Sequence, residues 1–218
     1  MEEKSSQSVK LSSLKPHFLF NALNSVKCEV ISDASDKVDL LDDFAAYLRY
    51  ILRFSENNNV ISAKEIVAFL GSYIRLEEAR YDQIRIIFEV ETLHFQMEAL
   101  TLFELIYNAI HHGLGGNAPD GKVWVRIQKG KGEVIIEIED NGKGIDPAIL
   151  PIIFEGQLPT GDHAASDGKR SMGIGLSVCM SIIQAHQGDM KAENMAAHRG
   201  ARIQFWLPCQ EENWMEEA

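Results

Sequence analysis

The sequence predicts an α+β protein, with a helical hairpin first and then a two-layer α/β sandwich in which helices cover one face of a sheet. Two observations predict this class. Apolar residues recur at helical spacing through the first part of the chain, whereas the later part mixes helical patterns with short alternating runs typical of strands. We therefore expect a helical domain at residues 1–60 and a sheet-containing domain at residues 61–218.

The bulk composition excludes some classes of function. The 218 residues are 45% hydrophobic and 24% charged, which are ordinary values for a globular protein. A formal net charge of −11 argues against nucleic-acid binding and against adsorption to an anionic membrane. Cys28, Cys179 and Cys209 form no CxxC pair, which suits a reducing compartment. With no secretory signal and no bilayer-long apolar run, we expect a cytoplasmic location, which includes the cytosolic part of a longer membrane-tethered protein.

Two helices are expected in the first domain. The first runs from about residue 11 to residue 30, is kinked or restarted at Pro16, and carries His17 and Asn21 on one face. The second carries a heptad seam beside another apolar stripe. The seam consists of Val38, Leu41, Ala45, Leu48 and Leu52, and the stripe of Leu40, Phe44, Tyr47 and Ile51. A hairpin cannot cover both faces, so we expect a homodimer that forms a four-helix bundle.

The second domain opens with a capping box at Ser62 and Glu65, which starts a helix that runs to about Arg80. The expected elements that follow are a strand at residues 83–91, a helix at 97–112, a strand hairpin at 122–128 and 133–139, a short helix at 146–154, a long loop at 155–171, a helix at 174–186, and strands at 191–195 and 202–207.

Asp140 follows the hairpin and begins the run Asp140-Asn141-Gly142-Lys143-Gly144. A carboxylate at a strand end can accept a hydrogen bond from an exocyclic amine such as that of adenine, and the glycines let the backbone approach a ring closely. Asp-Asn-Gly is also common turn chemistry. On its own, this run leaves a binding loop and a plain turn open.

Gly173-Ile174-Gly175-Leu176 is expected to end the long loop and to open a helix. Free N–H groups and the positive end of a helix make such a junction a natural phosphate site. Glycines at loop-to-helix junctions are often purely structural, so this run alone is a weak indication.

Asn108 shares a helix face with Glu104 and His112, which lie four residues before and after it. An amide oxygen is a plausible ligand for Mg²⁺, which bridges phosphates. Glu104 is placed to take a proton from a nucleophile or a water. The plainer alternative is a helix edge with exposed polar residues.

In combination, these segments resemble the N, G1, F and G2 boxes of the histidine-kinase/gyrase-type ATPases over residues 83–208. The matching residues are Asn108, Asp140, Gly142, Gly144, Phe154, Gly173, Gly175 and Leu176. The resemblance implies ATP and Mg²⁺ as cofactors, with Asn108 carrying Mg²⁺, Asp140 reading adenine and the long loop acting as a lid. It also implies that Lys169 and Arg170 reach the terminal phosphates, assisted by His111 and His112.

Residues 14–24, Leu-Lys-Pro-His-Phe-Leu-Phe-Asn-Ala-Leu-Asn, resemble the phosphoacceptor motif of LytS/YehU-type sensor histidine kinases. Leu48-Arg49-Tyr50 and Tyr73-Ile74-Arg75-Leu76-Glu77 are similar to later segments of that family. The resemblance implies that Nε2 of His17 attacks the γ-phosphoryl group of ATP. It further implies that the phosphoryl group then passes to an aspartate of a response-regulator receiver domain.

The sequence departs from this family at the proposed base. LytS-type kinases usually place Glu directly before the asparagine, where this chain has Tyr107, while Glu104 gives the Glu-x-x-x-Asn spacing of gyrase-type ATPases. Phe18 stands where conventional kinases keep an acid, so Glu104 is the best candidate base. Asn21 matches the position of a Thr or Asn that serves phosphatase action. The alternatives are a Glu104-dependent ATPase or Ser-directed kinase, and a non-catalytic ATP-binding scaffold.

Overall fold

The computed structural model describes residues 37–55, 60–81, 83–98, 100–115, 118–156, 167–196 and 199–209, with the backbone alone for residues 37–39, 52, 54–55 and 167–174. The expected helix at residues 11–30 lies outside this part of the chain. The chain divides into two compact units, one formed by Met1–Val60 with Lys64–Asp82 and the other by Ile61–Ala63 with Gln83–Ala218. Among the described helices, none has the length and apolarity needed to cross a bilayer.

The helical unit contains α2 (Lys37–Ser55) and α3 (Ala63–Arg80). The predicted apolar stripe of α2 is buried, from Leu40 to Ile51. Tyr47 stacks on Phe69 of α3 with ring centroids 5.6 Å apart, and Tyr50 stacks on the same ring at 3.7 Å. The other predicted face stays partly open, since Leu41 is 43% exposed.

An ion pair also ties these helices together. Arg75 donates from Nε to Oδ2 of Asp43 at 2.6 Å and from Nη2 to Oδ1. The hydrogen bond from Arg75 holds the pKa of the Asp43 carboxyl below its usual value, against the opposing effect of burial. The stacked rings and this pair group α3 with α2, whereas we expected α3 in the second domain, beyond a boundary at residue 60.

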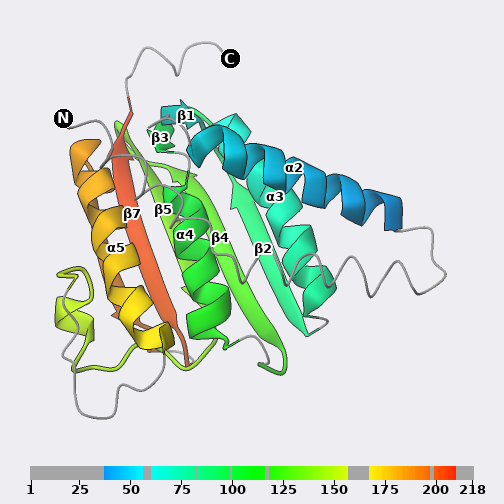
Figure 1. The fold of residues 1–218 in the computed structure, drawn as a ribbon. Coiled ribbons are helices and arrows are strands. Elements are labelled where there is room, and N and C mark those ends of the chain that lie inside the picture. Colours follow the sequence, from blue (N-terminus) through cyan, green and yellow to red (C-terminus); the bar gives the residue numbers. More distant parts are fainter. Residues whose placement is uncertain are drawn as a thin grey trace, which may run out of the picture. The chain divides into compact units, whose positions relative to one another are not determined.

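The sheet unit is built on a five-stranded sheet with the order β2-β4-β5-β7-β6. Its strands are β2 (Ile84–Val90), β4 (Gly121–Lys129), β5 (Glu133–Asp140), β6 (Asp189–Asn194) and β7 (Ala201–Pro208). β2 pairs with β4 in parallel, and the other pairs are antiparallel. A small two-stranded sheet pairs β1 (Val60–Ser62) with β3 (Gln96–Glu98). Figure 1 shows α4 (Thr101–Asn108) and α5 (Asp167–Ala185) against one face of the large sheet.

The two faces of the sheet differ as strand alternation requires. On the face toward α4 and α5, the central strands present a buried apolar layer: Val123, Val125, Ile127, Val134, Ile136 and Ile138. The residues between them, such as Arg126 and Glu139, point the other way. The predicted α+β class and the central hairpin are thereby confirmed.

Three elements differ from their expected bounds by more than two residues. The helix expected at residues 97–112 begins at Thr101, because Oε2 of Glu98 accepts hydrogen bonds from the Leu100 N–H at 3.0 Å and the Thr101 hydroxyl at 2.9 Å, which ends β3 and starts α4. The segment at 146–154 contains only a 3₁₀ turn, Leu150–Ile152. α5 begins at Asp167, within the expected loop.

Candidate functional site

The carboxyl end of α4 continues into a π-helical turn, Ala109–Gly113, which is closed by a hydrogen bond from the Leu114 N–H to the Ala109 carbonyl at 3.0 Å. Single π-helical turns at the end of an α-helix are frequent at functional sites. His111 and His112 are half-buried on this turn, and the His111 ring lies 4.1 Å from that of Tyr107. The turn brings Gly113 to the end of β5.

Asp140 is the last residue of β5, and its side chain is fitted against glycine backbone. Its Oδ1 accepts a hydrogen bond from the Gly142 N–H at 2.8 Å, and the residue is only 5% exposed. A Cβ on Gly113 would lie 2.7 Å from the Asp140 Oδ2, and a Cβ on Gly142 would lie 2.1 Å from the Gly113 carbonyl oxygen. A side chain at position 142 would meet main chain and needs a backbone shift, whereas one at position 113 would displace the Asp140 carboxylate.

The loop after Asp140 is held by two asparagines. Asn141 accepts a hydrogen bond from the Lys122 N–H at 2.7 Å and donates to the Asp120 carbonyl at 3.0 Å, which closes the loop onto the start of β4. Asn194 accepts from the Ile145 N–H and donates to the Ile145 carbonyl, both at 2.7 Å. Gly144 has a φ of 77° and faces Asn194, with room for no Cβ between them. The loop is thus fixed at both ends.

Glu104 links α4 to α5. It lies one turn before Asn108 and is half-buried, and its Oε1 occupies the space beside Gly175, where a Cβ would come within 2.7 Å of it. Leu176, the next residue of α5, is buried. Gly156 lies against Ser177 in the same way, so the segment that follows the half-buried Phe154 also reaches α5.

Asn108 is the one site residue with an unsatisfied polar atom that the structure records. The residue is 7% exposed, and its buried Nδ2 has no hydrogen-bond partner within the described part of the chain. An unpaired buried amide donor costs free energy unless a ligand satisfies it. The described residues contain no group of three His, Cys, Asp or Glu side chains able to hold a metal. The unpaired Nδ2 fits an acceptor oxygen such as that of a phosphate group. The Oδ1 of the same side chain is the kind of ligand that Mg²⁺ takes beside phosphate and water oxygens.

Some predicted residues are located only in part. His17 and Asn21 lie outside the described residues. Lys169, Arg170 and Gly173 lie in the first turns of α5, where the backbone alone is described. The expected loop-to-helix junction at Gly173 is therefore wrong for this structure, because the helical hydrogen bonds already begin at Asp167 and both glycines fall inside the helix. A glycine inside a helix costs about 1 kcal/mol relative to alanine.

Three further residues shape the site and were not singled out from the sequence. Gly113 lies against the Asp140 carboxylate, Asn194 anchors the loop, and Gly200 lies so close to the Asp140 carbonyl that a Cβ would overlap it. The sequence could have indicated Gly113, because it directly follows the expected helix that carries Asn108. Asn194 and Gly200 act across distant strands, and no local pattern marks them.

The geometry agrees with two family models. The model described as "Histidine kinase-, DNA gyrase B-, and HSP90-like ATPase" matches residues 99–211, and the model described as "Histidine kinase" matches residues 7–85. The first covers Asn108, Asp140 and Gly175, which the structure brings into one unit. The second covers His17 and the helical unit.

Several of the similar proteins are described as sensor kinases. Sensor histidine kinase YpdA of Escherichia coli is 29% identical over 150 residues, which cover 68% of this chain and 26% of YpdA. Sensor protein LytS of Bacillus subtilis is 25% identical over 209 residues, which cover 94% of this chain and 34% of LytS. In fold, the chain is similar to histidine kinase ThkA, solved in complex with response regulator protein TrrA, with a TM-score of 0.52 and 18% identity over 97% of this chain and 66% of that one.

The chain therefore spans about a third or less of the length of these curated relatives. The first family model covers more than half of its 218 residues. The protein belongs to the histidine kinase-, DNA gyrase B- and HSP90-like ATPase family and carries the catalytic core of a LytS-type histidine kinase.

Proposed function

We propose that this protein phosphorylates itself on His17 with ATP and Mg²⁺, and that the phosphoryl group then passes to an aspartate of a response-regulator receiver domain. The observation that carries the proposal is the buried Asp140 carboxylate, held between Gly113 and Gly142, together with the unpaired Nδ2 of Asn108 on the helix that leads to Gly113. The first family model supports ATP as the nucleotide, and the second supports His17 as the acceptor.

Each side chain has a proposed task at the nucleotide. Asp140 accepts a hydrogen bond from the exocyclic amine of adenine, and Gly142 and Gly144 let the backbone approach the ring. Asn108 offers its Oδ1 to Mg²⁺ and its Nδ2 to a phosphate oxygen. When bound, ATP supplies the phosphoryl group and Mg²⁺ neutralises its developing charge. The remaining residues proposed to line the phosphates or cover the nucleotide are His111, His112, Phe154, Lys169, Arg170, Gly173, Gly175 and Leu176.

At the acceptor, Nε2 of His17 forms a bond to the γ-phosphorus while the bond to the bridging oxygen of the leaving ADP breaks. The imidazole then loses its Nδ1 proton, and Glu104 is the proposed base. Asn21, one turn after His17, is proposed to position the water that hydrolyses the phosphohistidine in a phosphatase reaction.

The proposed assembly is a homodimer with a receiver domain as its partner. The open face of α2 at Leu41 supports a second copy of the chain, because a heptad seam is stabilised by a facing helix. The complex of ThkA with the response regulator TrrA supports the receiver. We further propose that the chain works in the cytoplasm as the kinase part of a longer sensor.

Radiolabelled ATP tests the acceptor directly. Wild-type protein should acquire label that is stable in base and lost in acid, as a phosphohistidine requires. His17→Gln should abolish this label, whereas His94→Gln, which changes a histidine of the sheet unit away from the site, should keep it. Equal labelling of His17→Gln would refute the acceptor assignment.

A second function, ATP hydrolysis, is favoured by one observation. Glu104 stands four residues before Asn108 and its carboxylate is held against Gly175, where it could activate a water. Release of free phosphate that is lost in Glu104→Gln and unchanged in His17→Gln would identify the protein as an ATPase. Phosphate release that depends on His17 would assign the turnover to the kinase instead.

A further inference from the structure

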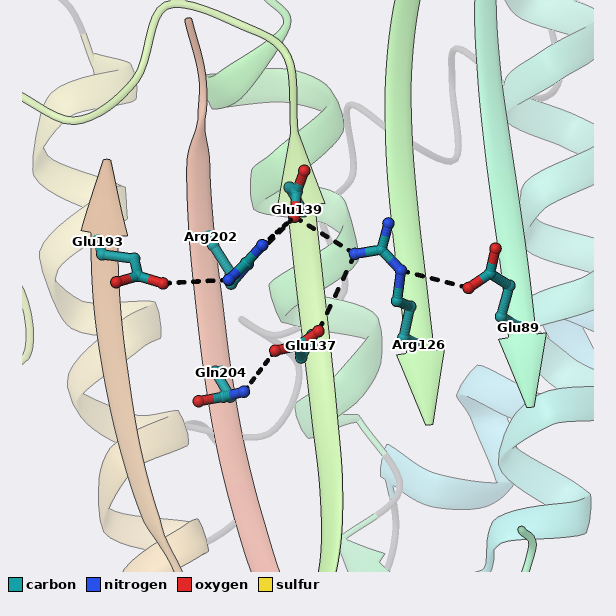
Figure 2. A network of polar contacts seen from close by, with 7 residues as sticks. All are labelled: Glu89, Arg126, Glu137, Glu139, Glu193, Arg202 and Gln204. Carbon is teal, nitrogen blue, oxygen red and sulfur yellow. Dashed lines mark hydrogen bonds and ion pairs between the residues drawn. The ribbon is translucent and has the colours of Figure 1, made fainter. Parts of the chain in front are cut away.

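A network of charged side chains lies on the sheet face away from α4 and α5. Figure 2 shows it crossing the strands from Glu89 on β2 to Glu193 on β6, with the helices behind the sheet. At its centre, Oε2 of Glu139 accepts hydrogen bonds from Arg202 Nε at 3.1 Å, Arg202 Nη2 at 2.8 Å and Arg126 Nη1 at 3.3 Å. One carboxylate thus joins β5 to both neighbouring strands.

Glu139 differs from the outer acids of the network in burial. Its side chain is 7% exposed, while those of Glu89 and Glu193 are 59% and 48% exposed. Exposed ion pairs contribute little, because water screens them. A buried carboxylate between two guanidinium groups is stronger, and its removal leaves both arginines without their shared acceptor. The hydrogen bonds that Arg202 donates to Glu139 are also the main cause that raises the pKa of Arg202.

The next residue after Glu139 is Asp140. Side chains alternate across a strand, so the two carboxylates point to opposite faces of the sheet and Glu139 cannot touch a ligand that Asp140 holds. Glu139 pairs with Trp124 and Arg202 across the sheet, and Asp140 pairs with Val123 as the last register position of β5 on β4. The Asp140 backbone is therefore held through the side chain beside it.

The backbone around Asp140 has little tolerance for a shift. A Cβ on Gly200 would lie 1.9 Å from the Asp140 carbonyl oxygen, and a Cβ on Gly113 would lie 2.7 Å from its carboxylate. Hydrogen bonds that a buried carboxylate accepts from a ligand depend on direction as well as distance. A small movement at the end of β5 would therefore change how Asp140 meets the base of a nucleotide.

We propose that Glu139 is a positioning residue for base recognition: together with Arg126 and Arg202 it braces the end of β5 from the opposite face and fixes the direction of the Asp140 carboxylate. The inference rests on the proposed function, since Asp140 must read adenine for the brace to matter. It predicts a specific defect, loss of preference for adenine over guanine, which general destabilisation of the domain does not produce.

The test compares Glu139→Gln with two matched variants, Glu89→Gln and Glu193→Gln, which make the same change at the ends of the same network. Dissociation constants for ATP and GTP would be measured by competition with a fluorescent nucleotide, beside the thermal midpoint. Glu139→Gln should raise the dissociation constant for ATP about tenfold and leave that for GTP within about twofold of wild type. Both matched variants should bind ATP with a dissociation constant within about twofold of wild type.

Other outcomes have distinct meanings. A wild-type ratio of ATP to GTP affinity in Glu139→Gln, or an equal loss for both nucleotides, would overturn the brace and leave the proposed function intact. Absence of any preference for ATP in wild type would overturn both. If Glu139→Gln does not fold, Arg202→Lys serves as the second variant, because it keeps the charge but loses the paired donors. It should weaken ATP binding about threefold and leave GTP binding unchanged. An unchanged ratio in that variant overturns the brace equally.

Discussion

Two polar side chains, one in each compact unit, are buried to nearly the same extent but differ in their hydrogen bonding. Asp43 of the helical unit is 8% exposed, and both of its oxygens accept hydrogen bonds from Arg75. Asn108 of the sheet unit is 7% exposed, and its Nδ2 has no partner among the described residues.

The difference separates a structural role from a binding role. A buried polar group that is satisfied within the protein stabilises the fold that satisfies it. A buried donor that is left unpaired costs stability, so its presence is best explained by a ligand that completes it. Asp43 therefore belongs to the packing of α2 on α3, and Asn108 to the candidate nucleotide site.

The largest expected effect is that of Gly142→Ala. The new Cβ would lie 2.1 Å from the Gly113 carbonyl oxygen, which is main chain and cannot rotate away. Forcing this contact costs about 1–3 kcal/mol of stability or more and displaces Asp140. We expect ATP binding measured by calorimetry to fall below detection. Gly132→Ala is the control: its φ of 72° disfavours a side chain, but no atom lies within 4 Å of the new Cβ, so this variant should bind ATP normally.

Asn108→Ala tests the binding role and comes next in size. Loss of a metal ligand should weaken Mg-ATP by about a hundredfold, the upper end of what even an outer-shell partner contributes. The free energy of unfolding without nucleotide should change little, because the substitution removes an unpaired buried donor as well as a side chain. A loss of unfolding free energy as large as the loss of binding free energy would show that Asn108 stabilises the fold, as Asp43 does. The contrast between the two residues would then be wrong.

Asp43→Asn should show the opposite pattern, with ATP affinity unchanged and stability lowered. We expect a loss of about 1 kcal/mol, because Arg75 is 59% exposed and water can solvate it once the carboxylate is gone.

The pH dependence of stability tests the contribution of the Asp43 carboxylate. Since Arg75 lowers the folded pKa of Asp43 from its ordinary 3.8, the ionised form stabilises the helices above that pH, and this contribution is lost as pH falls through the lowered folded pKa. Chemical denaturation at a series of pH values below 4 should therefore show a steeper loss for wild type than for Asp43→Asn. Parallel profiles would assign the acid sensitivity to other groups.

Much of the fold, and the places of Asn108 and Asp140 at the ends of α4 and β5, could be predicted from local pattern. The strands of the hairpin alternate cleanly because one face is buried, and Asp140 and Asn108 stand out because their neighbours obey these periods. The three-residue strands β1 and β3 carry too little pattern to be recognised, and they form only because the chain brings them together.

The rest of the site depends on contacts between distant segments. Asn194 bonds the Ile145 backbone across 49 residues, and Gly113 is constrained by a carboxylate 27 positions later in the chain (140 − 113). No period or propensity reports such a contact. The same holds for the grouping of α3 with α2, which follows from the Asp43–Arg75 pair and stacked rings rather than from any boundary signal.

The smallest expected effect on binding is that of Gly175→Ala, which differs from Gly142→Ala in the kind of atom that its new Cβ meets. Here the new Cβ would meet the Glu104 Oε1 at 2.7 Å, but a carboxylate at the end of a flexible side chain can rotate away, unlike the carbonyl that opposes Gly142. ATP affinity should stay within about twofold of wild type, because glycine can meet the phosphates only through its main chain, which alanine keeps. Phosphoryl transfer should slow by at least about tenfold if Glu104 is the base, since a displaced base loses its hydrogen-bond reach. Filter-binding and single-turnover assays on the same sample separate the two quantities. A loss of binding equal to that of Gly142→Ala would mean that Glu104 holds the nucleotide rather than acting on the transferred group.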